Sequence, residues 1–381
     1  MNKYRMTPYQ LFAGMVLYIL GTSSVIGIGS DAKQDAWLAV ILGGICGLII
    51  FIVLYGTLFK AYPDLSLKEM LETILGKLLG RILLLLYLCY FTFICFFIIR
   101  DVYELVNLFI LSYTPIYVIY GLLMFSIGFA VFHGIESLIR IAELFIVIVI
   151  FTILTIFVFI MLSDVCDFRQ LLPIMENGPK PIIKAATPLF IVLPFGEIFV
   201  FMTLFSLVNK KDKVIRTGAL AIITACLLLT MLTILDISTI GPYFHGNLPF
   251  PTLKTIRLIN IGNFIQRLDI ITINVFLICS MGRIVCFLYA VTSSLRDVCK
   301  TKTHKPFIIP IILIIILGSY LIGDNYTTYR ELGLEKEPYY VSFPFEIILP
   351  SFILMVHFIK LFFKKLSNKK NRNKPILQES N

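Results

Sequence analysis

Long apolar stretches separated by short polar segments run along the whole sequence. Each stretch can cross about 30 Å of hydrocarbon as a helix, which takes about 20 residues. The apolar side chains follow one another without the alternation of barrel strands, and this favours helices. The pattern therefore predicts an all-α integral membrane protein with ten transmembrane helices. The ten stretches cover approximately residues 8–29, 36–60, 82–111, 115–132, 138–162, 185–207, 214–237, 264–290, 306–323 and 344–363.

Two of these stretches are interrupted, and they occupy matching places. Five stretches form a first half, about residues 8–162, and five form a second half, about residues 185–363. The interruptions are Gly21-Thr22-Ser23-Ser24 in the first stretch, and Pro188 with Pro194-Phe195-Gly196-Glu197 in the sixth. Pro removes a backbone donor and Gly weakens helix continuity. Matched interruptions point to a transporter-like binding site at membrane depth, although small residues also serve close helix packing.

The exposed ends of broken helices determine what such a site can bind. Free N–H groups suit a carboxylate and free carbonyls suit an ammonium group or a cation, so a small zwitterion such as an amino acid matches both. Glu197 is the ionisable residue nearest the expected midplane of the membrane. It can act in ligand binding or hold the break together by a hydrogen bond. Tyr90 and Ile94 share one helical face and can line the pocket or fill the core. Thr272 and Asn274 can coordinate a cation or bridge helices.

Composition and charge narrow the class of protein. Apolar residues make up 58% and charged residues 15% of the 381 positions, whereas soluble domains carry about 25% charged residues. These figures exclude a soluble domain and a disordered chain. Most of the 33 Lys and Arg residues fall in segments on the same side as the N-terminus. Both termini are therefore expected to be cytoplasmic, and the net charge of +10 needs no nucleic-acid partner.

The domain organisation is simple. Residues 1–363 are expected to form a single transmembrane domain, and residues 364–381 a basic cytoplasmic tail whose partner is membrane lipid. Ser66-Leu67-Lys68-Glu69 is a capping-box pattern and predicts a helix along the inner surface. Apolar residues recur at helical spacing after Pro249-Phe250-Pro251-Thr252, and they predict a second interfacial helix up to about residue 261.

The sequence shows no sign of a metal centre or of an enzyme. The 8 Cys residues include no CxxC pair, and the 4 His residues have no partner at ligand spacing. Neither a GxSxG, a Walker loop nor an HExxH occurs. We therefore expect no catalytic residues and no cofactor. Whether a cation couples to ligand binding or transport is left open by the sequence.

Several of these motifs together resemble the spore germination permease family. They are Leu20-Gly21-Thr22-Ser23, Lys33-Gln34-Asp35-Ala36-Trp37, Pro194-Phe195-Gly196-Glu197, Pro249-Phe250-Pro251-Thr252 and Arg267-Leu268-Asp269. The resemblance extends from Thr7 to about Lys365. The family comprises the B subunits of spore germinant receptors and is related to the amino acid–polyamine–organocation transporters.

The resemblance implies a LeuT-like inverted repeat of five plus five helices, with helices one and six broken, in the spore inner membrane. It also implies recognition of a nutrient germinant, with an amino acid expected, and assembly with an A subunit and a lipoprotein C subunit. Proton-coupled relatives place a Lys in the middle of the fifth helix, but residues 146–156 contain no charge here. The implied pocket consists of Gly21, Thr22, Ser23, Tyr90, Ile94, Phe195, Gly196, Glu197, Thr272 and Asn274.

Two other functions remain compatible with the sequence. The protein can be a working secondary transporter that moves the amino acid across the membrane. It can also be a scaffold subunit that no longer binds a ligand. A receptor can retain the geometry of a transporter, so the sequence separates the receptor from the transporter poorly.

Overall fold

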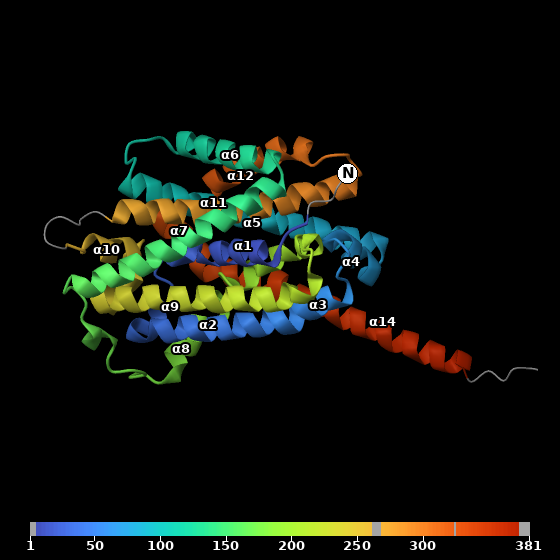
Figure 1. Ribbon diagram of the computed structural model, residues 1–381, viewed down its shortest axis with the longest axis horizontal. Coiled ribbons are helices and arrows are strands. Elements are labelled where there is room, and N and C mark those ends of the chain that lie inside the picture. The colour runs from blue at the N-terminus through green and yellow to red at the C-terminus, as the bar shows by residue number, and fades with distance from the viewer. Residues whose placement is uncertain (1–4, 261–267, 324, 373–381) are drawn as a thin grey trace, which may run out of the picture.

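The computed structural model describes residues 5–260, 268–323 and 325–372, and it is built from helices (Figure 1). Within these ranges, β pairing is limited to an isolated bridge between Met6 and Val208. The α-helices are α1 (Pro8–Leu20), α2 (Ala36–Ile50), α3 (Gly56–Ala61), α4 (Leu67–Leu75), α5 (Lys77–Phe109), α6 (Ile116–Phe132), α7 (Ile135–Leu162), α8 (Pro179–Ala185), α9 (Val214–Asn247), α10 (Pro251–Arg257), α11 (Asp269–Cys299), α12 (Ile308–Leu321), α13 (Tyr326–Glu331) and α14 (Leu349–Arg372).

The described residues contain six helical segments long and apolar enough to cross a membrane. Three shorter apolar helices accompany them, and the predicted segment at 185–207 is a series of short helical pieces. The prediction of an all-helical membrane protein is therefore confirmed. The six long segments are Ser30–Ala61, Lys77–Phe109, Ile139–Leu162, Lys211–Asn247, Asp269–Cys299 and Tyr326–Leu366.

The long helices run roughly side by side, with α1 inside the bundle (Figure 1). α1 packs against α7, α9 and α11, while α5 packs against α4, α11 and α12. α4 lies at one end of the bundle and α10 at the other, and α14 extends beyond the body at the α4 end (Figure 1). We call these the α4 end and the α10 end.

The first break lies directly after α1. Thr7 and Gln10 form a capping box that starts the helix, and the helix ends at Leu20. A short 3₁₀ turn, η1 (Thr22–Ser24), follows, and the next helical piece is η2 (Ser30–Asp35). A Cβ on Gly21 would lie 2.2 Å from Cδ of Arg283. The absence of a side chain at Gly21 therefore lets a side chain from α11 cross the chain where α1 ends.

The second break separates α8 and the π-helical segment η5 (Ala186–Phe190) from the 3₁₀ segment η6 (Gly196–Thr203). Pro188 and Pro194 cannot donate backbone hydrogen bonds, so a regular α-helix cannot continue through this region. A Cβ on Gly196 would lie 2.2 Å from Oε2 of Glu346. Each predicted interruption thus ends a regular helix, and each contains a glycine against which a charged side chain packs.

The last predicted stretch, 344–363, is too short. A continuous helical segment starts at Tyr326 and includes three π-helical pieces: η10 (Leu332–Lys336), η11 (Pro338–Ser342) and η12 (Pro344–Ile348). Two of these pieces begin with Pro, whose missing donor is compatible with a widened turn. Residues 326–343 lie outside the predicted stretch, but they are helical and include the buried Glu337; Glu346, inside the predicted stretch, is buried as well.

Helices form at both sequence positions where interfacial helices were predicted. Ser66 and Glu69 form the expected capping box of α4, and α10 occupies part of the segment predicted after residue 249. The predicted start of the eighth stretch at residue 264, Arg267 and the tail beyond residue 372 lie outside the described residues.

A candidate ligand cavity between the two helix breaks

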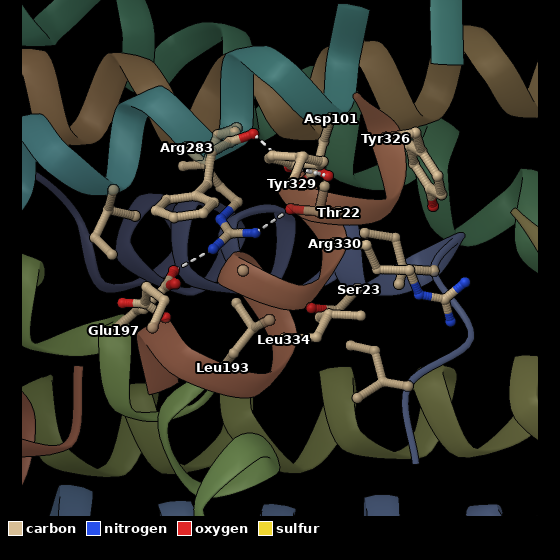
Figure 2. A pocket seen from close by; sticks show the side chains of 17 residues that line it. Thr22, Ser23, Asp101, Leu193, Glu197, Arg283, Tyr326, Tyr329, Arg330 and Leu334 are labelled. Carbon is tan, nitrogen blue, oxygen red and sulfur yellow. Dashed lines mark hydrogen bonds and ion pairs between the residues drawn. The ribbon is translucent and has the colours of Figure 1, made fainter. Parts of the chain in front are cut away.

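A buried ion pair joins the two breaks. The guanidinium of Arg283 donates hydrogen bonds to Oε2 of Glu197, beside the second break, and to Oγ1 of Thr22, in the first (Figure 2). The side chains of Arg283 and Glu197 are only 1% and 4% exposed. The Tyr18 hydroxyl lies 3.2 Å from the same Glu197 oxygen and donates to it. Arg283 therefore holds together two irregular segments that are far apart in the sequence.

Burial makes this pair interdependent. Removing a charged group from water costs several kcal/mol, and a partner of opposite charge with further hydrogen bonds offsets that cost. The first break contributes Thr22 as a neutral acceptor, whereas the second contributes a full negative charge from Glu197. Loss of either charge would leave the other buried without compensation.

A small cavity adjoins the ion pair. The space open to the centres of water molecules is about 50 Å³, which is enough for a few waters. Thr22, Ser23, Glu197 and Arg283 line it together with residues of α5 and of the helix after residue 326. Within the described part of the chain, Ser23 Oγ and Arg283 Nε are buried without a hydrogen-bond partner. A polar ligand or ordered water in the cavity would satisfy such atoms.

Acidic groups complete the polar lining. Asp101 on α5 accepts a hydrogen bond from the Tyr329 hydroxyl (Figure 2), and Glu337 accepts one from Ser342. Both carboxyl groups line the cavity, as does Arg330, which donates to the Gly246 carbonyl at 2.9 Å. The cavity therefore presents groups of both signs, an arrangement suited to a zwitterion.

A wider recess lies next to the cavity, on the side of α8. Its volume is about 760 Å³, and it includes residues of η2, α8 and the segment after residue 326. Ile28, Arg330 and Leu334 line both spaces. These three side chains therefore stand between the small cavity and the wider recess, and their movement would connect the two.

A family model described as "Spore germination protein" matches residues 5–327. The chain belongs to the spore germination permease family. Spore germination protein KB of Bacillus subtilis (strain 168) is 31% identical over 356 residues, which cover 93% of this chain and 95% of that protein. The putative spore germination protein YfkT of the same organism is 30% identical over 265 residues, with 70% and 71% covered. Spore germination protein A2 is 25% identical over 276 residues, with 72% and 74% covered.

In this spore germination permease, several of the residues expected at the pocket meet at the cavity. Thr22, Ser23, Ile94 and Glu197 line it directly. Gly21 borders it by giving space to the stem of Arg283. These residues come from α5 and from both breaks, so the tertiary structure assembles segments that the sequence separates.

Three further residues expected at the pocket are not among those that line the cavity. Tyr90 is buried and donates a hydrogen bond of 2.5 Å to Oε1 of Glu346. Gly196 packs against the other oxygen of the same carboxyl group. Phe195 instead packs on α2, where a Cβ on Gly47 would lie 2.4 Å from the Phe195 Cβ. Its ring therefore contributes to helix packing.

The structure does not bring Thr272 and Asn274 to the cavity. Thr272 donates to the Leu268 carbonyl and lines a separate small cavity, about 16 Å from Arg283 along the helix axis by the rise per residue. Asn274 is exposed and donates to the Ile270 carbonyl at 2.8 Å. At about 100° per residue, nine positions place Asn274 on the face of α11 opposite Arg283. The inclusion of these two residues is corrected.

Sequence reasoning missed Arg283, Asp101, Glu337 and Glu346. A lone Arg inside an apolar stretch is costly in a membrane, and by that principle alone it marks a functional site. Arg283 also has the charge that the buried Glu197 requires. Glu337 could not be found in this way, because the helix containing it was predicted to begin later.

Proposed function

We propose that this protein is the membrane subunit of a spore germinant receptor, and that it recognises a small nutrient germinant in the cavity between the two breaks. Membership of the spore germination permease family and the helical membrane architecture support this assignment. The observation that carries it is the pair of buried, unpartnered polar atoms, Ser23 Oγ and Arg283 Nε, beside the cavity.

An amino acid fits the chemistry of this site. Its carboxylate would accept hydrogen bonds from Arg283 and Ser23, and its ammonium group would face Asp101 and Glu337. The cavity holds only a few waters, so the bound state must be more open than the one described. A ligand that favours the open state shifts the population toward it, and this shift is the signal that partner subunits would receive.

The wider assembly follows the same family resemblance. We place both termini and the α4 end on the cytoplasmic side, and we propose ten spans arranged as a LeuT-like inverted repeat in the spore inner membrane. The excess of Lys and Arg in the segments on the side of the N-terminus supports this orientation, and the matched breaks support the inverted repeat. The partners would be the receptor A subunit and the lipoprotein C subunit, without a cofactor.

Two neighbouring serines allow a matched test of the cavity. Ser23→Ala removes an unpartnered hydroxyl at the cavity, whereas Ser24→Ala removes one that donates to the Gly21 carbonyl at 3.0 Å and lies on a different small cavity. Spores lacking the gene are first exposed to single amino acids and sugars, to find the nutrient that they no longer answer. Germination of both variant strains is then followed against the concentration of that nutrient.

One lost hydrogen bond to a charged ligand is worth about 1.5–3 kcal/mol, so Ser23→Ala should raise the half-effective concentration at least about tenfold. Ser24→Ala should leave it within about twofold. Immunoblots of spore membranes establish that both variants accumulate normally. An unchanged response in Ser23→Ala would favour the scaffold function, and sustained solute flux by the reconstituted protein would favour the transporter.

A further inference from the structure

Four oxygen-bearing side chains form a continuous chain next to the ligand cavity. Ser342 donates to Oε1 of Glu337, the Ser342 and Tyr90 hydroxyls lie 2.9 Å apart, and Tyr90 lies 2.5 Å from Oε1 of Glu346. Glu337 lines the cavity, whereas Glu346 is fully buried. The chain therefore leads from the cavity into the protein interior.

Hydrogen counting shows that this chain requires an extra proton. Its three oxygen–oxygen contacts each need one hydrogen, but the hydroxyls of Ser342 and Tyr90 supply only two. With both carboxyl groups ionised, one contact would bring two lone pairs together without a hydrogen between them. A proton on either glutamate completes the set.

The surroundings of Glu346 also favour an extra proton at this place. In the described part of the chain its Oε2 has no hydrogen-bond partner, and such an oxygen costs far less in a neutral carboxyl group than in an ionised one. A Cβ on Gly196 would lie only 2.2 Å from this oxygen. The close backbone leaves space for a proton but none for a metal ion on that side.

We propose that Glu337 and Glu346 form a binding site for a single proton, shared through Ser342 and Tyr90. Transfer along the chain is balanced. Glu337 gives its hydrogen to Ser342, Ser342 gives its own to Tyr90, and Tyr90 gives its own to Glu346. One proton leaves the cavity side, one arrives in the interior, and no electrons are exchanged.

Other titratable groups around Glu346 set the charge balance. Glu197 on η6 is neutralised by Arg283 on α11, while the hydroxyl groups of Tyr55 and Tyr87 donate to the Glu346 and Phe345 carbonyls at 2.8 and 3.0 Å. The remaining groups that face the carboxyl group are Tyr18 on α1, Tyr90 on α5 and Glu337 on its own helix. Arg283 is already paired with Glu197, so the bound proton neutralises one of the two remaining glutamates, and the pair carries a single negative charge.

Infrared spectroscopy of the purified full-length protein in lipid nanodiscs tests the site without any germinant. At about pH 7, wild-type protein should show the carbonyl band of a protonated carboxylic acid. Glu346→Gln and Glu337→Gln should each remove this contribution, because an amide supplies its own hydrogen to the chain. Glu136→Gln, which alters an exposed glutamate on α7, should leave the spectrum unchanged.

Two variants are used because one of them can fail to fold. Loss of the band in either variant, if that variant is soluble and monodisperse, is sufficient support. If the band persists in both folded variants and in the double variant, the proton site is wrong. It is also wrong if wild-type protein has no acid band that these substitutions remove.

Coupling of this proton to the ligand rests on the proposed function. Because Glu337 faces the cavity, a charged ligand there and the proton must affect each other's affinity reciprocally. In wild-type spores the half-effective nutrient concentration should change with pH, by at most about tenfold per unit for one proton. Glu346→Gln should remove that dependence. An infrared band without coupling would overturn only the link to ligand binding, whereas the Ser23 variant tests recognition itself.

Discussion

Among the Arg–Glu ion pairs in the described part of the chain, two lie in opposite environments. Arg283 and Glu197 are almost completely buried between the helix breaks, whereas Arg81 and Glu72 join α5 to α4 at 2.7 Å with 45% and 19% of their side chains exposed. Bulk water can solvate the second pair when it separates, whereas the first is buried beside a cavity that has room for only a few water molecules. The same two residue types therefore hold a site together in one place and only adjust a surface contact in the other.

The largest expected difference is in the cost of losing the arginine. Arg283→Gln leaves Glu197 buried without a cation, and this should lower the free energy of unfolding by about 3–5 kcal/mol. Arg81→Gln should lower it by less than about 1 kcal/mol. Thermal unfolding of both proteins in detergent, together with immunoblots of spore membranes, measures the difference.

The double variant Glu197→Gln/Arg283→Gln is the control for this prediction. Neutral amides do not carry the cost of an isolated buried charge, so protein accumulation should recover while the nutrient response stays lost. Equal stability of Arg283→Gln and Arg81→Gln would contradict the distinction between the two environments.

The second prediction concerns the space that the buried pair requires. An added methyl group in Gly21→Ala would lie 2.2 Å from Cδ of Arg283, so the side chain or the break must shift. Overpacking of this kind costs about 1–3 kcal/mol. Gly282→Ala, on the same helix as Arg283, has no atom within 4 Å of the added methyl group and should be neutral or stabilising by up to about 1 kcal/mol. Thermal unfolding in detergent compares the two, and destabilisation in both would show that the effect is not specific to the ion pair.

The smallest expected effect is the pH dependence of the surface pair. The hydrogen bond from Arg81 lowers the pKa of Glu72 from its ordinary value. The resulting stabilisation is complete above the pKa in the unfolded chain, about 4.3. It disappears as the pH falls through the lower folded value. Wild-type protein should therefore exceed Glu72→Gln by less than about 1 kcal/mol at pH 7, and the two should converge at about pH 3. If wild-type protein is still more stable than Glu72→Gln at about pH 3, the effect comes from packing of the side chain and not from its charge.

Much of the architecture could be predicted from local patterns. The apolar stretches predicted the helices, and Gly21 and the segment from Pro188 to Gly196 lie in the two irregular segments that interrupt them. The capping box at Ser66 began α4 where expected. Each of these signals depends on side chains that are neighbours along the chain, so a single sequence contains them in full.

The site was less predictable because its partners are distant along the chain. Asn274 looked as suitable as any polar residue of its stretch, but only the rotation of α11 decides that it faces outward while Arg283 faces the breaks. The helix that starts at Tyr326 was hidden for a related reason. Glu337 fell outside the predicted stretches, and only the fold shows that it lines the cavity and accepts a hydrogen bond from Ser342.

The sequence by itself determined that this is a membrane protein, where its helices lie, where the two breaks fall and to which family it belongs. Apolar length, missing backbone donors and a set of local motifs are sufficient for those conclusions. Only the tertiary structure decided which charges meet, because a buried carboxylate can be neutralised by any cation or proton that the fold brings within reach. Here the fold gives Arg283 to Glu197 and leaves Glu337 and Glu346 joined through two hydroxyl groups.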